Sequence, residues 1–271
     1  MLGRTGRQVT LLGLGGEGVL RTFGRDGEAS ALIERALDGG IAYCESARAY
    51  AGSEAYYGKT LRERRKEVFL ASKSHARDRE GALAHLRETL SNLRTDHLDL
   101  WQVHDVRSRK ELEAIFGPGG AIEAFVKAKE EGKVRFIGVT GHEDPFITRE
   151  CLERYDFDTV LLPVNPAEPR HLSFLEHAVP LAKEKGVGII GMKVYCHGFA
   201  SRIPGYTGME PFLRYALSQP VSTVVIGCDD LSQIEENVRY ATAFQPMTSG
   251  EMQEIEEVVA PYARQLMYYK K

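Results

Sequence analysis

The 271-residue sequence has few cysteines and no long hydrophobic run. Its four cysteines, Cys44, Cys151, Cys196 and Cys228, include no C-x-x-C pair, which excludes a zinc ribbon or ferredoxin-type cluster held by local spacing. No apolar stretch approaches the roughly 18 residues that a membrane span needs. Met1 is not followed by a charged region and an apolar region typical of a secretory signal. These absences predict a cytoplasmic protein with reduced thiols.

The sequence also has little net charge. Its 35 Lys and Arg residues nearly balance 38 Asp and Glu residues, and the formal charge is −3. That balance argues against a nucleic acid or an anionic membrane surface as the partner. No linker rich in Pro, Gly or Ser and no shift in composition divides the chain, so residues 1–271 are expected to form one domain.

Short runs rich in Leu and β-branched residues alternate with longer amphipathic stretches. Helices are expected at residues 30–38, 53–65, 79–93, 121–131, 145–154, 171–185, 210–218 and 231–243. Strands are expected at residues 11–14, 42–45, 68–73, 98–103, 134–140, 159–162, 187–192 and 223–226. Parallel strands need crossover helices, and eight such pairs match a closed (β/α)8 barrel in number and size. The sequence therefore predicts an α/β TIM barrel.

Two segments are expected outside the eight units. Residues 2–11 contain a turn-like Thr-Gly-Arg and predict a small hairpin that covers the bottom of the barrel. Residues 251–268 predict an additional amphipathic helix. Ser30 and Ser53 are suitable residues to begin their helices.

The first predicted strand runs into a glycine-rich motif. Gly13–Gly18 satisfies G-x-G-x-x-G, and Glu45 closes the second strand as a Rossmann dinucleotide site would require. That site needs a helix directly after the glycines, yet Gly24 and Gly27 interrupt the segment and the helix is expected only near Ser30. Glu45 also lies farther after the glycines than the roughly 20 residues expected of the acidic residue in a Rossmann site. The favoured alternative is a loop at the barrel mouth, where glycines let the backbone approach a ligand.

Chemically reactive side chains follow three consecutive strands. In a (β/α)8 barrel the chemistry lies at the carboxyl ends of the strands. Glu45 and Tyr50 follow the second strand, Lys73 ends the third, and His104 follows the fourth. An acid, a phenol, an ammonium and an imidazole together form a set for proton transfer.

The same strand ends leave a second enzyme class open. A metal-dependent TIM-barrel hydrolase would use histidine, cysteine and carboxylate ligands, although no H-x-H or H-E-x-x-H occurs. The candidate ligands are His75, His104, His142, Cys196 and His197, with Glu45 as a further one.

In order along the chain, several segments resemble the aldo-keto reductase superfamily. They are residues 2–6, 12–16, 40–50, 68–73, 99–104, 132–139, 213–220 and 234–237. The resemblance implies an NAD(P)(H)-dependent oxidoreductase that interconverts a small-molecule aldehyde, ketone or sugar and its alcohol by hydride transfer. Tyr50 would be the general acid and base, His104 would orient the carbonyl, and the carboxylate of Glu45 would hold Lys73. An ammonium about 4 Å from the phenol would lower the pKa of Tyr50 by roughly three units before the losses from desolvation.

The resemblance also implies which residues hold the cofactor, with some departures. Relatives have aspartate at Glu45, Ser-Asn at Thr140-Gly141, and a stacking aromatic at Met192. Two carboxylates and no cation follow the eighth strand. This arrangement slightly favours NAD(H), whereas the family favours NADP(H), and the cofactor preference stays open. The implied cofactor residues are Gly15, Gly16, Thr140, Gly141, Asn165, Met192, Lys193, Cys228, Asp229, Gln233, Glu236 and Asn237.

Two expectations concern function and the pocket. The replacement of aspartate by Glu45 leaves open a nucleotide-binding regulatory protein with little turnover, similar to the potassium-channel beta subunits. Because no long segment follows the last helix, we expect an open pocket or one completed by a neighbouring subunit. Residues expected to shape it are Glu17, Val106, Tyr195, Phe199, Arg202 and Tyr206.

Overall fold

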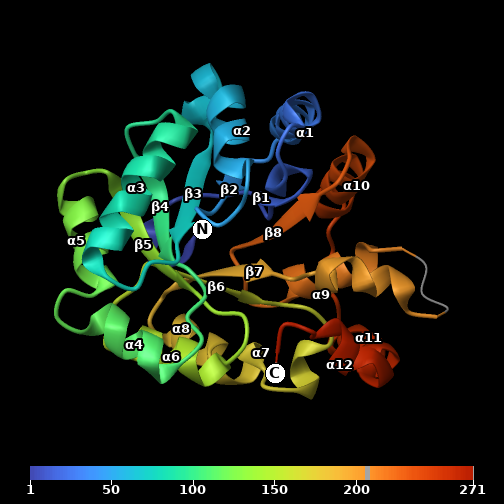
Figure 1. The fold of residues 1–271 in the computed structure, drawn as a ribbon. Coiled ribbons are helices and arrows are strands. Elements are labelled where there is room, and N and C mark those ends of the chain that lie inside the picture. Colours follow the sequence, from blue (N-terminus) through green and yellow to red (C-terminus); the bar gives the residue numbers. More distant parts are fainter. Residues whose placement is uncertain (205–207, 271) are drawn as a thin grey trace.

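The computed structural model describes residues 1–204 and 208–270. Within these residues, eight parallel strands close a barrel in sequence order, with β8 beside β1 (Figure 1). The strands are β1 (Leu12–Gly18), β2 (Tyr43–Glu45), β3 (Phe69–Ser74), β4 (Leu98–Val103), β5 (Val134–Thr140), β6 (Thr159–Pro163), β7 (Gly188–Met192) and β8 (Thr223–Cys228). The predicted (β/α)8 barrel is confirmed.

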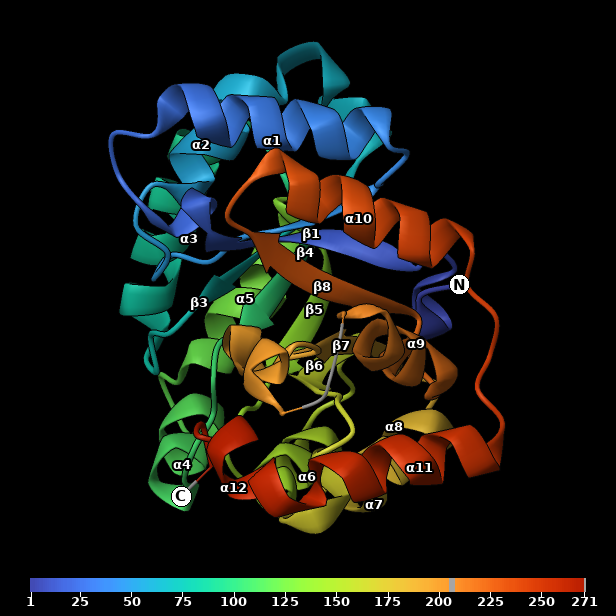
Figure 2. The ribbon, with the colours of Figure 1, turned by 90° about the vertical axis from the view of Figure 1, so that its right-hand side faces the viewer.

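The helices surround this barrel, as Figures 1 and 2 show. They are α1 (Asp26–Asp38), α2 (Ser53–Thr60), α3 (Arg79–Leu93), α4 (Arg109–Phe116), α5 (Ala121–Glu130), α6 (Pro145–Arg154), α7 (Phe174–His177), α8 (Val179–Glu184), α9 (Glu210–Ser218), α10 (Leu231–Thr242), α11 (Ser249–Val259) and α12 (Ala263–Leu266). Each crossover helix packs outside the sheet because a parallel strand must return over that face.

The core has an inner and an outer part. A small apolar cluster that includes Leu2, Leu100 and Ile190 is separate from a larger cluster formed by strand and helix residues. Tyr43 and Phe69 of the small cluster stack with ring centroids 5.7 Å apart. Because both faces of the strands are covered, their sequences are nearly continuous apolar runs rather than alternating ones.

The N-terminal segment covers the bottom of the barrel but is not the predicted hairpin. Residues 2–11 hold a 3-10 turn at Gly3–Thr5, closed by the Leu2 N–H donating to the Arg7 carbonyl at 2.8 Å. Leu2 is fully buried with the inner core residues. The Arg4 N–H donates to the Gly186 carbonyl, so the segment is tied to the barrel and forms a single turn rather than a paired hairpin.

The first two helices differ from their predicted bounds. α1 begins at Asp26, four residues early, because Gly27 faces open space and costs only its weak helix propensity there. Ser30 is inside the helix, and its hydroxyl hydrogen-bonds Thr60 at 2.9 Å instead of capping. α2 begins after Gly52 and ends at Thr60, and a 3-10 segment (Arg62–Glu67) follows.

Proline and capping residues explain the other differences. The predicted helix 171–185 is divided into α7 and α8, and Pro180 lies in the first turn of α8, where its missing N–H is tolerated. The predicted helix 251–268 is divided in the same way at Pro261 into α11, a 3-10 turn and α12. α4 was not predicted, although the Ser108 hydroxyl caps it by accepting from the Glu111 N–H.

Two findings bear on the predicted location. Among the described residues, no helix is both long and apolar enough to span a bilayer. All four cysteines are buried free thiols, as expected. The cytoplasmic location stays a prediction.

Candidate active site

The barrel brings the four predicted catalytic residues together. Glu45 ends β2, Lys73 lies near the end of β3, and His104 follows β4, while Tyr50 lies in the loop before α2. Lys73 Nζ is 2.6 Å from Glu45 Oε1 and 4.9 Å from the centre of the Tyr50 ring. The His104 ring meets the Tyr50 ring edge-on, with centroids 5.8 Å apart. All four side chains are buried.

The carboxylate of Glu45 is held from two sides. Its Oε1 meets Lys73, and its Oε2 accepts hydrogen bonds from the Tyr43 hydroxyl at 3.1 Å and Gln102 Nε2 at 3.0 Å. Lys73 Nζ also donates to the Ser46 carbonyl at 2.9 Å. The extra methylene relative to aspartate therefore lets one carboxylate reach Lys73 and the inner residues together.

Shortening this side chain tests whether the network is built for glutamate. In Glu45→Asp the carboxylate loses about 1.5 Å of reach, roughly one C–C bond, and one of its two sets of partners. We expect kcat to fall about tenfold, although relatives have aspartate here. This loss is smaller than the roughly 10²- to 10⁴-fold effect of general acid–base catalysis, because a carboxylate remains. Steady-state kinetics measures this, and unchanged kcat would show that the network adapts.

The pKa of Tyr50 is raised well above its ordinary value, so burial outweighs the lowering expected from Lys73. Burial is the largest cause, and the negative charges of Glu17 and Glu45 add to it, while Arg21 opposes them. The Lys73 ammonium lies 4.9 Å from the centre of the ring and is paired with Glu45 at 2.6 Å. That ion pair weakens, but does not cancel, the attraction of Lys73 for negative charge on the phenol.

Two histidines beside this group are neutral at pH 7. Burial, followed by the charge of Lys73, holds the pKa of His104 well below its usual range. Burial is also the main reason that the pKa of His142 falls to about 4. Their rings lie 6.2 Å apart, and His104 Nδ1 is buried without a hydrogen-bond partner among the described residues. His104 can thus orient a substrate oxygen as a neutral imidazole.

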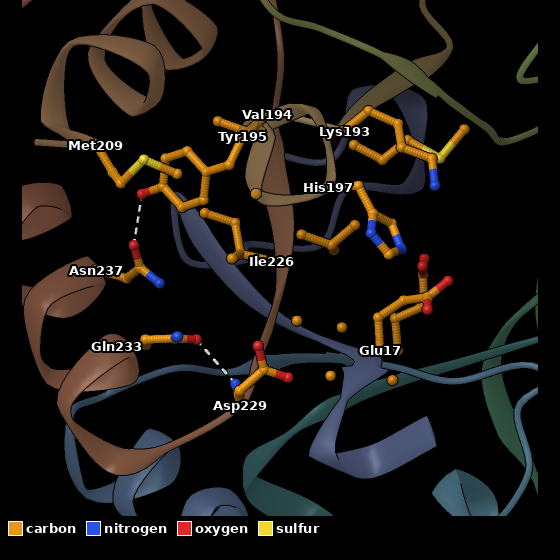
Figure 3. Close-up of a pocket in the computed structure, with 18 of the residues that line it drawn as sticks. Glu17, Lys193, Val194, Tyr195, His197, Met209, Ile226, Asp229, Gln233 and Asn237 are labelled. Atoms are coloured by element: carbon orange, nitrogen blue, oxygen red, sulfur yellow. Dashed lines mark hydrogen bonds between the residues drawn. The ribbon is translucent and has the colours of Figure 1, made fainter. Parts of the chain in front are cut away.

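A cleft of about 440 Å³ opens over Tyr50 and Glu45. Figure 3 shows Glu17, Lys193 and His197 toward one end, and Gln233 and Asn237 toward the other. Further lining residues are Gly18, His142, Val194, Tyr195, Gly198, Ser201, Met209, Val225, Ile226, Gly227 and the predicted cofactor residues named next.

The predicted cofactor residues divide into two groups. Those that line the cleft are Gly15, Gly16, Met192, Lys193, Asp229, Gln233, Glu236 and Asn237.

The other four are engaged elsewhere. The Thr140 hydroxyl accepts from the Asp105 N–H at 2.7 Å, and Gly141 packs against Thr148. Asn165 Nδ2 donates to the Lys193 carbonyl and to the Tyr269 hydroxyl, and its Oδ1 accepts from the Ala167 N–H. Cys228 Sγ accepts from Asn237 Nδ2 at 3.6 Å. The structure does not bring these four to the cleft.

The glycines form the end of β1 rather than the predicted loop. A Cβ at Gly16 would lie 2.4 Å from Ser53 Oγ and 3.0 Å from Tyr50 Cδ2. A Cβ at Gly227, on the neighbouring β8, would lie 2.6 Å from the Glu17 Cβ. The glycines thus allow the close approach expected at a barrel mouth.

Two residues at the mouth were missed by the sequence analysis. Arg21 Nη1 donates to both carboxylate oxygens of Glu17 at 2.9 and 3.0 Å, and its guanidinium lies 4.8 Å from the centre of the Tyr50 ring. The four-residue spacing of Glu17 and Arg21 was the sequence signal that could have indicated this ion pair. Tyr268 packs edge-on against His197 and Phe199, so the segment after α12 lies beside the mouth. Tyr206 lies outside the described residues.

The histidines and cysteines do not form a metal centre. In the part of the chain that the structure describes, no three His, Cys, Asp or Glu side chains gather as metal ligands would. The alternative of a metal-dependent hydrolase therefore lacks a ligand set here.

Comparison with known sequences decides the family. Residues 12–207 match the profile of the Aldo/keto reductase family. The chain belongs to this family. L-galactose dehydrogenase from Arabidopsis thaliana is 27% identical over 96% of this chain and 93% of its own length. The uncharacterized oxidoreductase YqkF from Bacillus subtilis is 24% identical over 80% of this chain and 83% of its own length.

Solved structures confirm the fold of this aldo/keto reductase. The holo form of AKR11C1 from Bacillus halodurans superposes with a TM-score of 0.76 at 24% identity and covers 93% of this chain and 95% of that one. An aldo/keto reductase from Klebsiella pneumoniae in complex with NADP and acetate has a TM-score of 0.75 at 18% identity. The superposition covers 93% of this chain and 92% of that one. The chain is therefore an NAD(P)H-dependent oxidoreductase with a barrel of this family.

Proposed function

We propose that this chain interconverts a polar carbonyl compound and its alcohol, with Tyr50 exchanging the proton of the substrate oxygen. The observation that carries the proposal is the buried contact of Tyr50 with Lys73 and His104 beside the cleft. Of these three residues Tyr50 lines the cleft, which supports its hydroxyl as the group that exchanges a proton with a bound carbonyl. A phenol that stays protonated at neutral pH is an acid ready to donate.

The other predicted catalytic residues support this exchange. His104 meets the Tyr50 ring edge-on, and as a neutral imidazole it would support the exchange by a hydrogen bond to the carbonyl oxygen. Lys73 lies beside the Tyr50 ring and stabilises negative charge that develops on the phenol during proton donation. Glu45 fixes the Lys73 ammonium at 2.6 Å.

The cleft has the groups that a nicotinamide dinucleotide needs. Met192, Val225 and Ile226 supply apolar surface, and the Lys193 ammonium has no ion pair among the described residues, so it is available to a phosphate. At the other end Gln233 and Asn237 project from α10 (Figure 3). When bound, the nicotinamide supplies or accepts the hydride.

The α10 end of the cleft favours NAD(H) over NADP(H). Asp229 is exposed there, and among the described residues no Lys or Arg lines this end. Asp230 caps α10 by accepting from the Gln233 N–H at 3.1 Å, so a protein carboxylate already occupies the positive end of the helix. A 2′-phosphate would meet repulsion, whereas a ribose hydroxyl could donate to Asp229.

Reversing the charge at Asp229 tests this preference. In Asp229→Arg we expect the ratio of kcat/KM for NADPH over NADH to rise about tenfold to hundredfold, because a repulsion becomes a charge-assisted hydrogen bond. Asp96→Arg, at a highly exposed residue outside the cleft, is the charge-matched control. An unchanged ratio in Asp229→Arg would show that the 2′ position of the cofactor ribose does not bind beside Asp229.

The substrate proposal is a polyhydroxylated aldehyde or sugar. Glu17, His142, Lys193 and His197 line the cleft and offer hydrogen bonds to several hydroxyl groups. The nearly full-length similarity to a relative named for its action on L-galactose supports a sugar as the first test. Dinucleotide titration followed by a panel of sugars, aldehydes and ketones, and their alcohols, measures the activity. No hydride transfer with any member would contradict the proposed function.

A regulatory protein with little turnover remains the second candidate. The high pKa of Tyr50 favours it, because a buried phenol beside two carboxylates is a weak acid. Single-turnover mixing of the NADH-bound protein with a reactive aldehyde separates the two candidates. Bound NADH that is never oxidised would favour the regulatory protein.

A further inference from the structure

One guanidinium holds the backbone on the carboxyl side of His104. Arg77, in the loop between β3 and α3, donates from Nη1 to the His104 carbonyl at 2.9 Å and from Nη2 to the Asp105 carbonyl at 2.7 Å. Its side chain is 21% exposed, so the contact is mostly shielded from water. The planar fork of an arginine can bridge two acceptors in this way, whereas the ammonium of a lysine is a single point charge.

The backbone that Arg77 holds has an unusual conformation. Asp105 has a φ of +53°, in the left-handed region, which is unfavourable for a residue that carries a side chain. Its N–H donates to the Thr140 hydroxyl at 2.7 Å, and the Val106 N–H donates to the Thr140 carbonyl at 3.0 Å. The turn after His104 is therefore held from β5 and, independently, by Arg77.

The imidazole of His104 depends on this backbone for its direction. Its Nδ1 is buried and has no hydrogen-bond partner among the described residues. The ring contacts with Tyr50 and His142 are packing contacts, which are less directional than hydrogen bonds. The His104 N–H donates to the Ser74 carbonyl at 2.9 Å. With Arg77 at its carbonyl, both backbone polar groups of His104 are anchored to the end of β3 and to the loop that follows it.

We propose that Arg77 is a positioning residue that sets the direction of the His104 imidazole toward the substrate oxygen. The inference rests on the proposed function, because it takes His104 as the group that hydrogen-bonds the carbonyl. Arg77 lies outside the lining of the cleft, so it acts through the backbone of His104 and not on the substrate. Loss of the guanidinium would leave two carbonyls without their donor and allow the turn at Asp105 to relax.

A second arginine meets the same turn in a different way. Glu111 of α4 accepts at Oε2 from Arg77 Nη2 at 3.2 Å and from the Arg107 N–H at 2.7 Å. Arg107 Nε donates to Asp105 Oδ2 at 2.8 Å, so this arginine contacts the side chain of the turn and neither of the two carbonyls. Its own side chain is 55% exposed. Arg107 therefore supplies a matched control for Arg77.

A double-mutant cycle with His104 tests the proposal in single-turnover reduction of a reactive aldehyde by the NADH-loaded protein. Arg77→Met should slow hydride transfer about tenfold to hundredfold, because a displaced orienting group costs that much. In the His104→Ala background the same substitution should change the rate less than about twofold, since the group it positions is absent. Arg77→Lys keeps the charge but not the fork and should also be slower than wild type. Arg107→Met should retain the wild-type rate.

The ring resonances of His104 give a readout that needs no turnover. In ¹⁵N-labelled protein without cofactor, the signals that disappear in His104→Ala identify this ring. They should shift in Arg77→Met and stay in place in Arg107→Met. The Kd for NADH should change less than about twofold in both Arg77 variants, which would show an intact cleft.

Several results would overturn the proposal. They are a wild-type rate in either Arg77 variant, equal slowing by Arg77→Met in the wild-type and His104→Ala backgrounds, equal slowing by Arg107→Met, and His104 resonances that do not move in Arg77→Met. A larger change in NADH affinity would assign the effect of Arg77 to the cleft instead of to His104. If the wild type transfers no hydride, the proposed function fails, and the resonances still decide whether Arg77 holds His104.

Discussion

Tyr50→Phe is expected to lower kcat for carbonyl reduction by about 10³-fold, within the range of a lost general acid. The substitution removes one oxygen from a ring that is otherwise held by Lys73, His104 and Arg21. The ring should therefore stay in place, and the Kd for the dinucleotide should change less than about twofold. Steady-state kinetics and fluorescence titration with NADH measure the two effects.

The matched control is Tyr215→Phe. Tyr215 is also buried, but its hydroxyl donates to Glu256 at 2.7 Å and does not line the cleft. It should lose stability of about 1 kcal/mol, the usual net value of a hydrogen bond, and keep kcat. Equal kcat for Tyr50→Phe and wild type would show that another group, or water, donates the proton.

The barrel could be predicted because its signal is repeated along the chain. Each buried strand is a short apolar run, and each crossover helix leaves an amphipathic pattern. α4 was missed because an eight-residue helix has little periodicity, and its buried apolar residues are only Leu112 and Ile115. The hairpin prediction failed because the partners of Leu2 and Arg4 in the barrel, such as Gly186, are distant in sequence.

The candidate site could be predicted as a set but not in its electrostatics. Neighbouring parallel strands place their ends together, which is sufficient to gather Glu45, Lys73 and His104. The pKa of Tyr50 depends on its burial and on the charges around it, and no spacing rule placed Glu17 among those charges.

The cofactor residues show the same limit. The cofactor role of Asn165 stays a prediction, and in the structure its amide donates to the hydroxyl of Tyr269, which is 104 residues away in the chain. The Thr140 hydroxyl is likewise used by the Asp105 N–H. Such competition for a polar group is decided by tertiary contacts that a single sequence does not record.

A buried ion pair behind the site carries the largest expected effect on stability. Lys270 Nζ is 2.7 Å from Glu168 Oε2, and both side chains are almost fully buried. The ammonium also donates to the carbonyls of His171 and Leu172, both at 2.9 Å, and the Tyr269 hydroxyl donates to Glu168 Oε1. The pair therefore fastens the segment after α12 to the loop that follows β6.

Lys270→Met is expected to lower the free energy of unfolding by about 3 kcal/mol, because it leaves a buried carboxylate without its cation. Glu168→Gln combined with Lys270→Met should recover about half of the loss, since the amide still accepts from Tyr269.

Burial already raises the pKa of Glu168, and loss of Lys270, which opposes that rise, should raise it further. A carboxyl whose folded pKa exceeds its unfolded value loses stabilising free energy as pH rises between the two. The penalty of Lys270→Met should thus be smaller near pH 4 than at pH 8. Urea unfolding at both pH values measures it, and a pH-independent penalty would show that Glu168 is not the unpaired charge.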